Sequence, residues 1–543
     1  MKLKWLIVLL PAGLLLLLAG CRQQNNNKGK PEITPRNLAI NSSNAYNNLF
    51  LDSAAVEKYI AAQNPGDTIA NAMRSFYNAR NFEYAWFDEL GLTEQARGFR
   101  SLYHYSKDTT EGTRRLETRQ DALMNDDDST VNPHDPGIVK TELQLTQRFI
   151  QYALNKYDDI STSQLEQFIP IRKQPVLQLA DSVLAIDSRE HEQYKADNPG
   201  YAAMEKQLEK YTGIAKKGGW PAVTADKKKY RKGDSAPAIQ LVKKRLQITG
   251  ELAGADTTAL FNDTLEAAVK SFQQNHGYTP TGIITDTIIQ DMNVPALTRV
   301  QQLLINMERM RWAPGRPEGQ LIIVNIPEYM LHVWDGNKKV FDMEVVVGKE
   351  GSSTTQFSGD LNQVVFNPYW HVPRSIVRKE ILPAMEKNKH YLEENDMEIT
   401  GERNGLPVVR QLPGKKNALG HVKFLFPNSF NIYFHDTPAK WLFEKDKRAY
   451  SHGCIRLSDP LKMANYLLQD MPEWTPEKID SAFNKGDKEK YVRIKHAVPV
   501  LVTYYTAWVD EHNTLQFRED IYGHDARLAE KMFTDAKMIA AAK

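Results

Sequence analysis

The sequence predicts a multidomain α+β protein in which two helical units precede a β-rich domain. Three observations support this prediction. Apolar residues recur three and four positions apart over residues 46–228, short capped helices follow over residues 229–297, and β-type alternation begins near residue 320. A chain of 543 residues has room for about three or four domains, so these patterns can belong to separate folding units.

The N-terminus has the pattern of a secretory signal peptide over residues 1–20. Lys2 and Lys4 precede an apolar run from Trp5 to Ala19, which is shorter than the roughly 20 residues that cross a bilayer. The end of the run, "LAGC", resembles the lipobox of bacterial lipoproteins and implies cleavage before Cys21 and lipid attachment to that residue. The resemblance implies a protein anchored by lipid to a membrane of the bacterial cell envelope, facing the periplasm. An uncleaved signal anchor is the alternative.

Two helical units follow a polar segment. Residues 21–45 contain few side chains that could bury a face, and we expect a flexible tether there. Residues 46–228 predict a helical scaffold without chemistry of its own, and its aromatic cluster at residues 76–87 has the helical spacing of a core. Residues 229–297 predict three short helices, the first stopping at Gly250 and the second beginning with Asp263 and Glu266 at the spacing of a capping box.

The predicted three-helix bundle resembles a domain of wall enzymes. The order Gly-Asp, helix, "FNDTLEAAVKSFQ", then Gly-x-Ile is similar to the peptidoglycan-binding domain attached to many bacterial wall enzymes. Helical periodicity alone would fit any small bundle. The resemblance therefore implies peptidoglycan as the ligand.

A connecting helix over residues 298–318 leads into a β-rich domain over residues 319–525. Two β-type runs are separated by Asp335-Gly336, a hairpin signal, and further short β-type segments follow. Residues 370–420 are charged and helical in pattern, which predicts an inserted helical segment that could cap a groove. A C-terminal helix is expected over residues 526–543.

Cys454 is the most informative residue of the β-rich domain. The chain has two cysteines, and if Cys21 carries lipid, Cys454 has no disulfide partner within the chain. An unpaired thiol is unusual in an oxidising compartment, where cysteines ordinarily form disulfides, so its presence suggests a specific role. A zinc site would need companions such as Cys-x-x-Cys or His-x-x-x-His, which are absent around it. A buried core thiol and a nucleophile remain the two alternatives.

A histidine lies within reach of this cysteine in the predicted fold. In "NIYFHDTP", strand alternation sends Tyr433 and His435 to one face and the apolar Ile432 and Phe434 to the other. An imidazole that takes the thiol proton produces the reactive thiolate. Asp459-Pro460 reads as a helix cap, which predicts that Cys454 lies in a turn leading into a helix.

The spacing from His435 to "SHGC" resembles the signature of the L,D-transpeptidases. Further similar segments include "NMERMRW", "VNIPEYML", "NPYWHVPRSI" and "FREDIYGHD", and together they resemble the large, multidomain branch of that family. By matching positions, the resemblance implies Cys454 as nucleophile and His435 as its base. It also implies an oxyanion site formed by His452, Gly453 and the backbone near Cys454. The supporting residues it implies are Ser451, which fixes the loop, Tyr433, which lines the pocket, and Arg456.

Arg456 departs from the short-form family pattern, which often has Asn at this place. Its guanidinium is suited to a carboxylate of the peptide stem or to an internal salt bridge. We favour a role in substrate binding or in organising the site.

The resemblance implies acyl transfer within peptidoglycan. Cys454 would attack the carbonyl of the third residue of a tetrapeptide stem and release D-alanine, and the amine of a neighbouring stem would resolve the thioester into a 3-3 cross-link. It also implies acylation of the same thiol by carbapenem-type β-lactams. We expect no metal and no organic cofactor, and a monomer. One alternative is an L,D-carboxypeptidase or endopeptidase that hydrolyses the thioester, and another is a non-catalytic wall-binding lipoprotein.

Charge gives no case for a nucleic-acid partner. The chain has 69 basic and 67 acidic residues, so the two signs nearly cancel. The partners that the resemblances imply are peptidoglycan stems and, through the lipid, a membrane.

Overall fold

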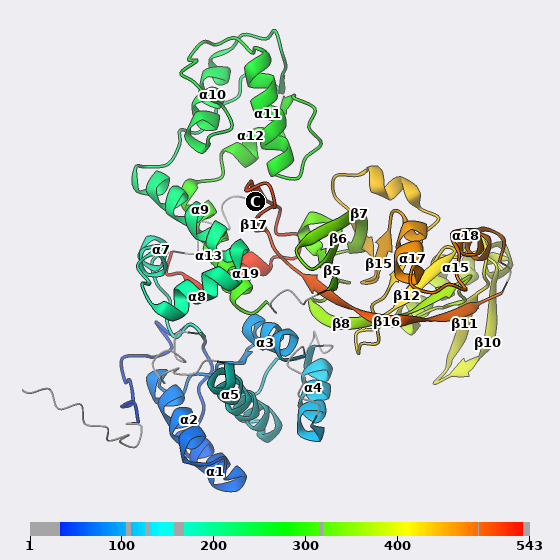
Figure 1. The fold of residues 1–543 in the computed structure, drawn as a ribbon, viewed down its shortest axis with the longest axis horizontal. Coiled ribbons are helices and arrows are strands. Elements are labelled where there is room, and N and C mark those ends of the chain that lie inside the picture. The colour runs from blue at the N-terminus through cyan, green and yellow to red at the C-terminus, as the bar shows by residue number, and fades with distance from the viewer. Residues whose placement is uncertain are drawn as a thin grey trace, which may run out of the picture.

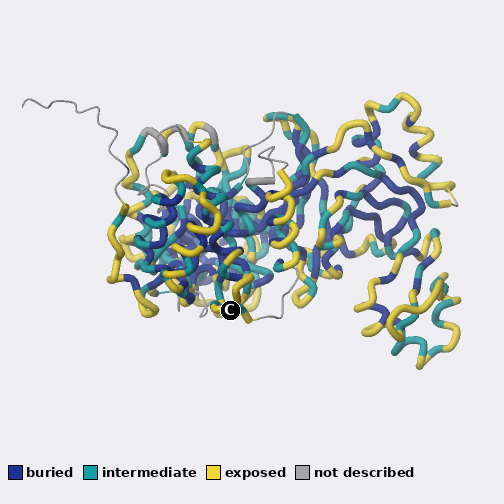
Figure 2. Tube along the Cα trace, turned by 90° about the horizontal axis from the view of Figure 1, so that it is seen from below, coloured by how far each residue is buried: buried dark blue, intermediate teal, exposed yellow. Residues whose placement is uncertain are grey.

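The computed structural model describes residues 33–104, 110–124, 130–156, 168–313, 319–486 and 488–535. Most helices lie on one side of the molecule and most strands on the other, whereas the helices within residues 237–292 stand apart from both (Figure 1). Buried segments run through both sides, whereas exposed residues lie on outer turns and loops (Figure 2). The expected signal peptide over residues 1–20 and the expected lipidation site at Cys21 lie outside the described residues. Within the described ranges, no helix is both long and apolar enough to cross a membrane.

The N-terminal region is helical, as the sequence predicts, and an aromatic core holds it together. The ring centroid of Trp86 lies 5.4 Å from that of Phe99 and 5.5 Å from that of Phe149, spacings typical of favourable ring pairs. Trp312, which follows the helix α13 (Ala296–Arg311), belongs to the same core. The scaffold elements are α1 (Ser53–Gln63), α2 (Asp67–Ala79), β1 (Phe87–Asp88), β2 (Gly91–Leu92), α3 (Glu94–His104), α4 (Glu111–Met124), α5 (Pro136–Lys156), α7 (Val176–Leu184), α8 (Arg189–Asp197) and α9 (Pro199–Lys216).

The expected flexible tether over residues 21–45 needs a correction in the part that the structure describes. The backbone N–H of Thr34 donates to Ser75 of α2, and that of Asn37 donates to the Asn78 carbonyl. Ile40 is buried with 3% of its surface exposed. These contacts satisfy backbone groups that a free tether would leave to water, so residues 34–45 pack onto the scaffold.

Three helices form the next unit: α10 (Pro237–Thr249), α11 (Asp263–Asn275) and α12 (Asp286–Met292). Gly250 ends α10 in the left-handed conformation, as the sequence predicts. The cap of α11 differs from the expectation, because Asn262 rather than Asp263 accepts the N–H of Leu265. A two-stranded pair closes the unit, formed by β3 (Lys229–Tyr230) and β4 (Ile284–Thr285).

A nine-stranded sheet forms the β-rich domain, in the order β14-β7-β15-β13-β12-β8-β16-β5-β6. Strand β6 also pairs with β7, so the sheet closes on itself around an apolar core. The hairpin between β6 and β7 turns at Asp335-Gly336, where the sequence predicts it. The strands are β5 (Gln320–Asn325), β6 (Met330–Asp335), β7 (Lys338–Gly348), β8 (Phe357–Phe366), β12 (Val422–Leu425), β13 (Phe434–His435), β14 (Ala449–Ser451), β15 (Ile455–Leu457) and β16 (Lys490–Thr503).

The inserted segment over residues 370–420 is only partly helical. Helical turns run through α14 (Arg374–Ile376), η2 (Val377–Ile381), α15 (Leu382–Lys387) and α16 (Tyr391–Glu394). A three-stranded sheet of β9 (Trp370–His371), β10 (Met397–Arg403) and β11 (Leu406–Gln411) completes it. The sequence signal for this hairpin is Asn404-Gly405, both of which have positive φ, as a tight turn of this kind requires.

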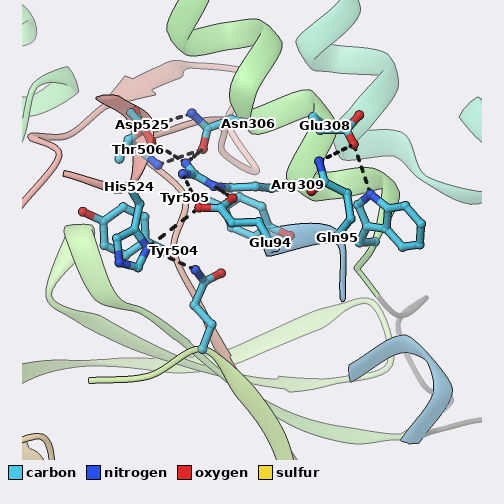
Figure 3. Close-up of polar contacts among 12 residues, drawn as sticks. Glu94, Gln95, Asn306, Glu308, Arg309, Tyr504, Tyr505, Thr506, His524 and Asp525 are labelled. Carbon is cyan, nitrogen blue, oxygen red and sulfur yellow. Dashed lines mark hydrogen bonds and ion pairs between the residues drawn. The ribbon is translucent and has the colours of Figure 1, made fainter. Parts of the chain in front are cut away.

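A buried polar network ties the scaffold, α13 and the end of the sheet together (Figure 3). Arg309 of α13 donates to Glu94 of α3 over 2.9 Å and to Asp525 of α19 (His524–Met532) over 2.5 Å. Thr506 donates to the other oxygen of Asp525. Although burial disfavours its charge, Glu94 and Asp525 raise the pKa of Arg309 well above its ordinary value. Paired charges therefore fix how the β-rich domain sits on the helices.

The remaining C-terminal elements are α17 (Pro460–Leu468), α18 (Pro476–Lys485), β17 (Ala507–Val509) and β18 (Leu515–Phe517). The cap of α17 is Asp459, which accepts the N–H of Lys462, with Pro460 as the first helical residue, as predicted. The last helix, α19, begins two residues before the expected 526–543 segment, and residues 536–543 lie outside the described part of the chain.

Candidate active site

Two short parallel strands build the site. In the pairing of β13 with β15, Phe434 lies opposite Ile455 and His435 lies opposite Arg456. Phe434 and Ile455 are fully buried in the core of the sheet. Alternation along each strand therefore places His435 and Arg456 on the other face, together with the preceding residues Tyr433 and Cys454. Strand β15 also separates Cys454 from α17, so the predicted turn does not lead directly into the helix.

His435 is held as a neutral imidazole with one defined tautomer. Its Nδ1 lies 2.6 Å from the backbone carbonyl oxygen of Asp436. A carbonyl oxygen can only accept, so Nδ1 carries the proton and Nε2 keeps its lone pair. Burial, aided by the charge of Arg456, lowers the pKa of His435 to about 3. The ring is therefore an unprotonated base at neutral pH.

Cys454 is partly exposed and rests in the thiol state. Its Sγ lies 3.5 Å from the backbone oxygen of Asn431. Burial raises the pKa of the Cys454 thiol to about 11, while hydrogen bonds from Tyr433 and the charge of Arg456 act against the increase. Since both the thiol and the His435 ring are neutral, the thiol proton has to move as the sulfur attacks.

Contact between Cys454 and His435 remains a prediction. Among the described hydrogen bonds, the thiol is paired with Asn431 and none joins its sulfur to the imidazole. A hydrogen bond between a nucleophile and its base can form only once substrate is bound. The shared face of the two strands supplies the proximity on which the prediction depends.

Ser451 holds the loop that carries the cysteine. Its hydroxyl accepts the N–H of Gly453 over 3.2 Å and donates to the carbonyl oxygen of Cys454 over 2.5 Å. Gly453 has a φ of +108°, a conformation that L side chains rarely adopt. This local geometry agrees with the loop-fixing role that we predict for Ser451.

The His452 side chain is directed to the inserted segment. Its Nε2 lies 2.8 Å from Oε1 of Glu380, which belongs to η2. Any oxyanion contact from residue 452 would therefore come from its backbone rather than its ring. Sequence reasoning did not single out Glu380, which lies within a charged helical pattern that has no distinctive spacing.

Arg456 lies on the site face with unused donor capacity. It is partly buried, and its Nε has no hydrogen-bond partner among the described residues. The described ion pairs include none to this guanidinium, which speaks against the internal salt bridge that we considered. Burial lowers the pKa of Arg456, with the neighbouring Cys454 acting against this decrease. The planar guanidinium is a group that suits a substrate carboxylate.

The described residues offer no obvious metal site. Within the ranges given above, no group of three or more His, Cys, Asp or Glu side chains gathers where it could hold a metal ion.

Three segments of the chain match known domain families. Residues 319–493 match the L,D-transpeptidase catalytic domain, residues 71–208 match a scaffold domain, and residues 235–292 match a domain described as "Putative peptidoglycan binding domain". A curated relative, the "Putative L,D-transpeptidase" of Haemophilus influenzae, is 30% identical over 288 residues, which are 50% of this chain and 57% of the relative. The match thus spans little more than half of that relative's length.

Solved L,D-transpeptidases are more distant in sequence. The enzyme from Mycobacterium smegmatis is 14% identical, over 35% of this chain and 60% of its own, with a TM-score of 0.20. That from Stackebrandtia nassauensis is 11% identical, over 51% of this chain and 97% of its own, with a TM-score of 0.22. The domain matches give the assignment: the chain is a multidomain protein with a scaffold domain, a peptidoglycan-binding domain and an L,D-transpeptidase catalytic domain.

Proposed function

We propose that this protein is a peptidoglycan L,D-transpeptidase that uses Cys454 as nucleophile and forms 3-3 cross-links between peptide stems. The observation that carries the proposal is the convergence of Cys454, Tyr433, His435 and Arg456 on one face of the paired strands β13 and β15. The catalytic-domain match over the same segment supports it.

The first half-reaction acylates the enzyme. The Cys454 sulfur attacks the carbonyl carbon of the third residue of a tetrapeptide stem while Nε2 of His435 takes the thiol proton. Backbone N–H groups of the loop stabilise the oxyanion. The bond to the terminal D-alanine then breaks, His435 returns the proton to the leaving amine, and a thioester remains.

The second half-reaction transfers the acyl group. The side-chain amine of a neighbouring stem attacks the thioester carbonyl and loses a proton to His435. The carbon–sulfur bond breaks, and the thiolate takes back that proton. The bond energy comes from the peptide that was cleaved, so the reaction requires no nucleotide. The guanidinium of Arg456, on the same strand face, is suited to a carboxylate of the stem.

The test is incubation of the purified protein with tetrapeptide-bearing muropeptides, followed by mass analysis of the products. Cross-linked dimers whose mass equals that of two tetrapeptide muropeptides less one D-alanine support transpeptidation. Trimmed monomers would identify a hydrolase that uses the same thioester, and no product would indicate a wall-binding protein. If the Cys454→Ala variant still forms dimers, the assignment of the nucleophile is wrong.

We also propose that lipid on Cys21 anchors the protein in the cell envelope, facing the periplasm, as a monomer. The "LAGC" sequence at residues 18–21 supports the anchor. In bacterial cells, the Cys21→Ser variant should leave the lipid-labelled membrane fraction. Light scattering of the chain from residue 22 onward should give the mass of one chain.

A further inference from the structure

Thr354 connects the active-site loop to the end of β7. Its Oγ1 lies 2.8 Å from the carbonyl oxygen of Gly453 and 2.9 Å from the backbone nitrogen of Gly348. An N–H can only donate and a carbonyl can only accept. The Thr354 hydroxyl therefore accepts from Gly348 and gives its single proton to Gly453. Thr354 is 1% exposed, so water does not compete for these bonds.

Fixing the Gly453 carbonyl also fixes the N–H of Cys454. The two groups belong to one peptide unit, which is trans and planar, so the N–H points opposite to the carbonyl. The hydrogen bonds of the described residues give this N–H no acceptor. It is therefore an oriented donor beside the sulfur, on the side of the peptide that faces away from Thr354.

Tyr522 holds Thr354 in turn. Its hydroxyl donates to the Gly348 carbonyl over 2.5 Å and accepts the N–H of Thr354 over 3.3 Å. A second tyrosine supports it, because the Tyr504 hydroxyl accepts the N–H of Tyr522 over 2.9 Å. The loop before β8 is also tight against β7, since a Cβ on Gly348 would lie 2.1 Å from the carbonyl oxygen of Ser352.

We propose that Thr354 is a positioning residue for the reaction: through the Gly453 carbonyl it aims the N–H of Cys454 at the oxyanion of the acyl-transfer step, and Tyr522 holds Thr354 in place. The inference rests on the proposed function, because an oxyanion arises only when the thiol attacks a carbonyl. Thr354 should therefore affect the stabilisation of the oxyanion but not the reactivity of the thiol.

Two reagents separate these properties in the full mature chain. Iodoacetamide alkylates a thiol by displacement and develops no oxyanion, whereas the carbapenem imipenem acylates it through one. For Thr354→Val, which keeps the shape and removes the hydroxyl, we expect acylation to slow about 10- to 100-fold while alkylation stays within about twofold. Rates are read from the intact mass of the protein, and kcat should fall more than KM rises with muropeptide donors.

Thr354→Ser is the matched control, because it restores the hydroxyl, and it should acylate within about threefold of wild type. Tyr522→Phe keeps Thr354 but removes the hydroxyl that accepts its N–H, and we expect a loss of acylation rate between those of wild type and Thr354→Val. This variant tests the inference even if Thr354→Val does not fold. Unchanged acylation in Thr354→Val, or an equal loss of acylation and alkylation, would overturn the inference. If wild type is alkylated at Cys454 but not acylated, the proposed function itself fails, and the inference fails with it.

Discussion

His276 and His435 are the same chemical species in two different surroundings. Each is buried, each holds its Nδ1 against a backbone carbonyl, and burial lowers the pKa of each to about 3. His276, at the end of α11, stacks on Phe272 at 3.8 Å and lies 5.4 Å from the ring of Phe517. His435 instead shares its face with Cys454 and Arg456.

A lowered pKa therefore does not by itself identify a catalytic histidine. Desolvation lowers both values and reports only that the rings are buried. The neighbours differ, since His276 packs between aromatic rings with Asp291 and Arg299 close enough to affect its pKa, whereas His435 shares a strand face with Cys454. The two histidines thus form a natural pair of test and control.

The largest effect is expected from replacing His435 by Gln. A glutamine can still bond the Asp436 carbonyl but cannot take a proton, so kcat for muropeptide dimer formation should fall about 10²- to 10⁴-fold. Product mass analysis at equal protein concentration measures the change. Dimer formation within tenfold of wild type would remove His435 from the role of base.

His276→Ala is the second prediction and should affect stability instead of catalysis. Losing a stacked buried ring costs roughly 2–4 kcal/mol, and the three-helix unit should lose the ring contact between His276 and Phe517 of β18. Calorimetry should show an earlier unfolding transition. The rate of Cys454 acylation at a temperature where the variant is folded should match wild type, and a 100-fold loss would contradict the comparison.

The fold class was predictable from periodicity and turn chemistry. The scaffold helices, the Asp335-Gly336 hairpin and the Gly250 stop follow from local patterns that the tertiary structure keeps. The hairpin in the insertion was missed because its first strand, Met397–Arg403, carries three charges and its second, Leu406–Gln411, contains Pro407, which weakens a strand pattern. Such a half-exposed sheet leaves only the Asn404-Gly405 turn as a signal.

For the candidate site, the sequence indicated the residues with chemistry but not those that hold them. Cys454 and His435 stand out because a lone thiol and a strand-borne imidazole are uncommon choices. Thr354 and Glu380 are ordinary polar residues, and what matters about them is a partner that is 99 or 72 positions away. Long-range contacts of this kind depend on strand order, which local patterns do not specify.

The third prediction concerns stability in acid. With pKa values near 3 in the folded chain and an ordinary value near 6.5, His276 and His435 stay neutral while the unfolded chain takes up their protons. Each histidine should therefore lower the free energy of unfolding by about 1.4 kcal/mol per pH unit as pH falls from about 6.5 towards 3. Asp525, whose pKa burial raises to about 6, offsets part of this loss, because its folded form gains a proton in the same window.

The test compares calorimetric unfolding midpoints at about pH 7 and pH 5 in wild type and in His276→Phe. Phenylalanine keeps a ring against Phe272 but cannot titrate. Asp291, which raises the pKa of His276, and Arg299, which lowers it, are unchanged in the variant. Between about pH 7 and pH 5, the unfolding midpoint of the three-helix unit should fall less in the variant than in wild type. An equal drop would mean that the folded His276 takes up a proton after all.

The smallest effect is expected at Glu380, the contact between the insertion and the active-site loop. Its carboxylate and the His452 ring are 50% and 36% exposed, and pairs this open contribute between 0 and about 1 kcal/mol. Glu380→Ala should therefore change kcat/KM by less than about fivefold, because the catalytic groups on β13 and β15 do not depend on the pair. Hydrogen exchange in η2 should nevertheless increase, since the pair joins this helical turn to the Ser451–Cys454 loop. Glu386→Ala, which removes a carboxylate from α15 of the same insertion, is the control and should leave the exchange of η2 unchanged.

A loss of activity above 100-fold in Glu380→Ala would contradict this prediction. It would show that the insertion contributes to the chemistry and that the site extends beyond β13, β15 and the loop that carries Cys454.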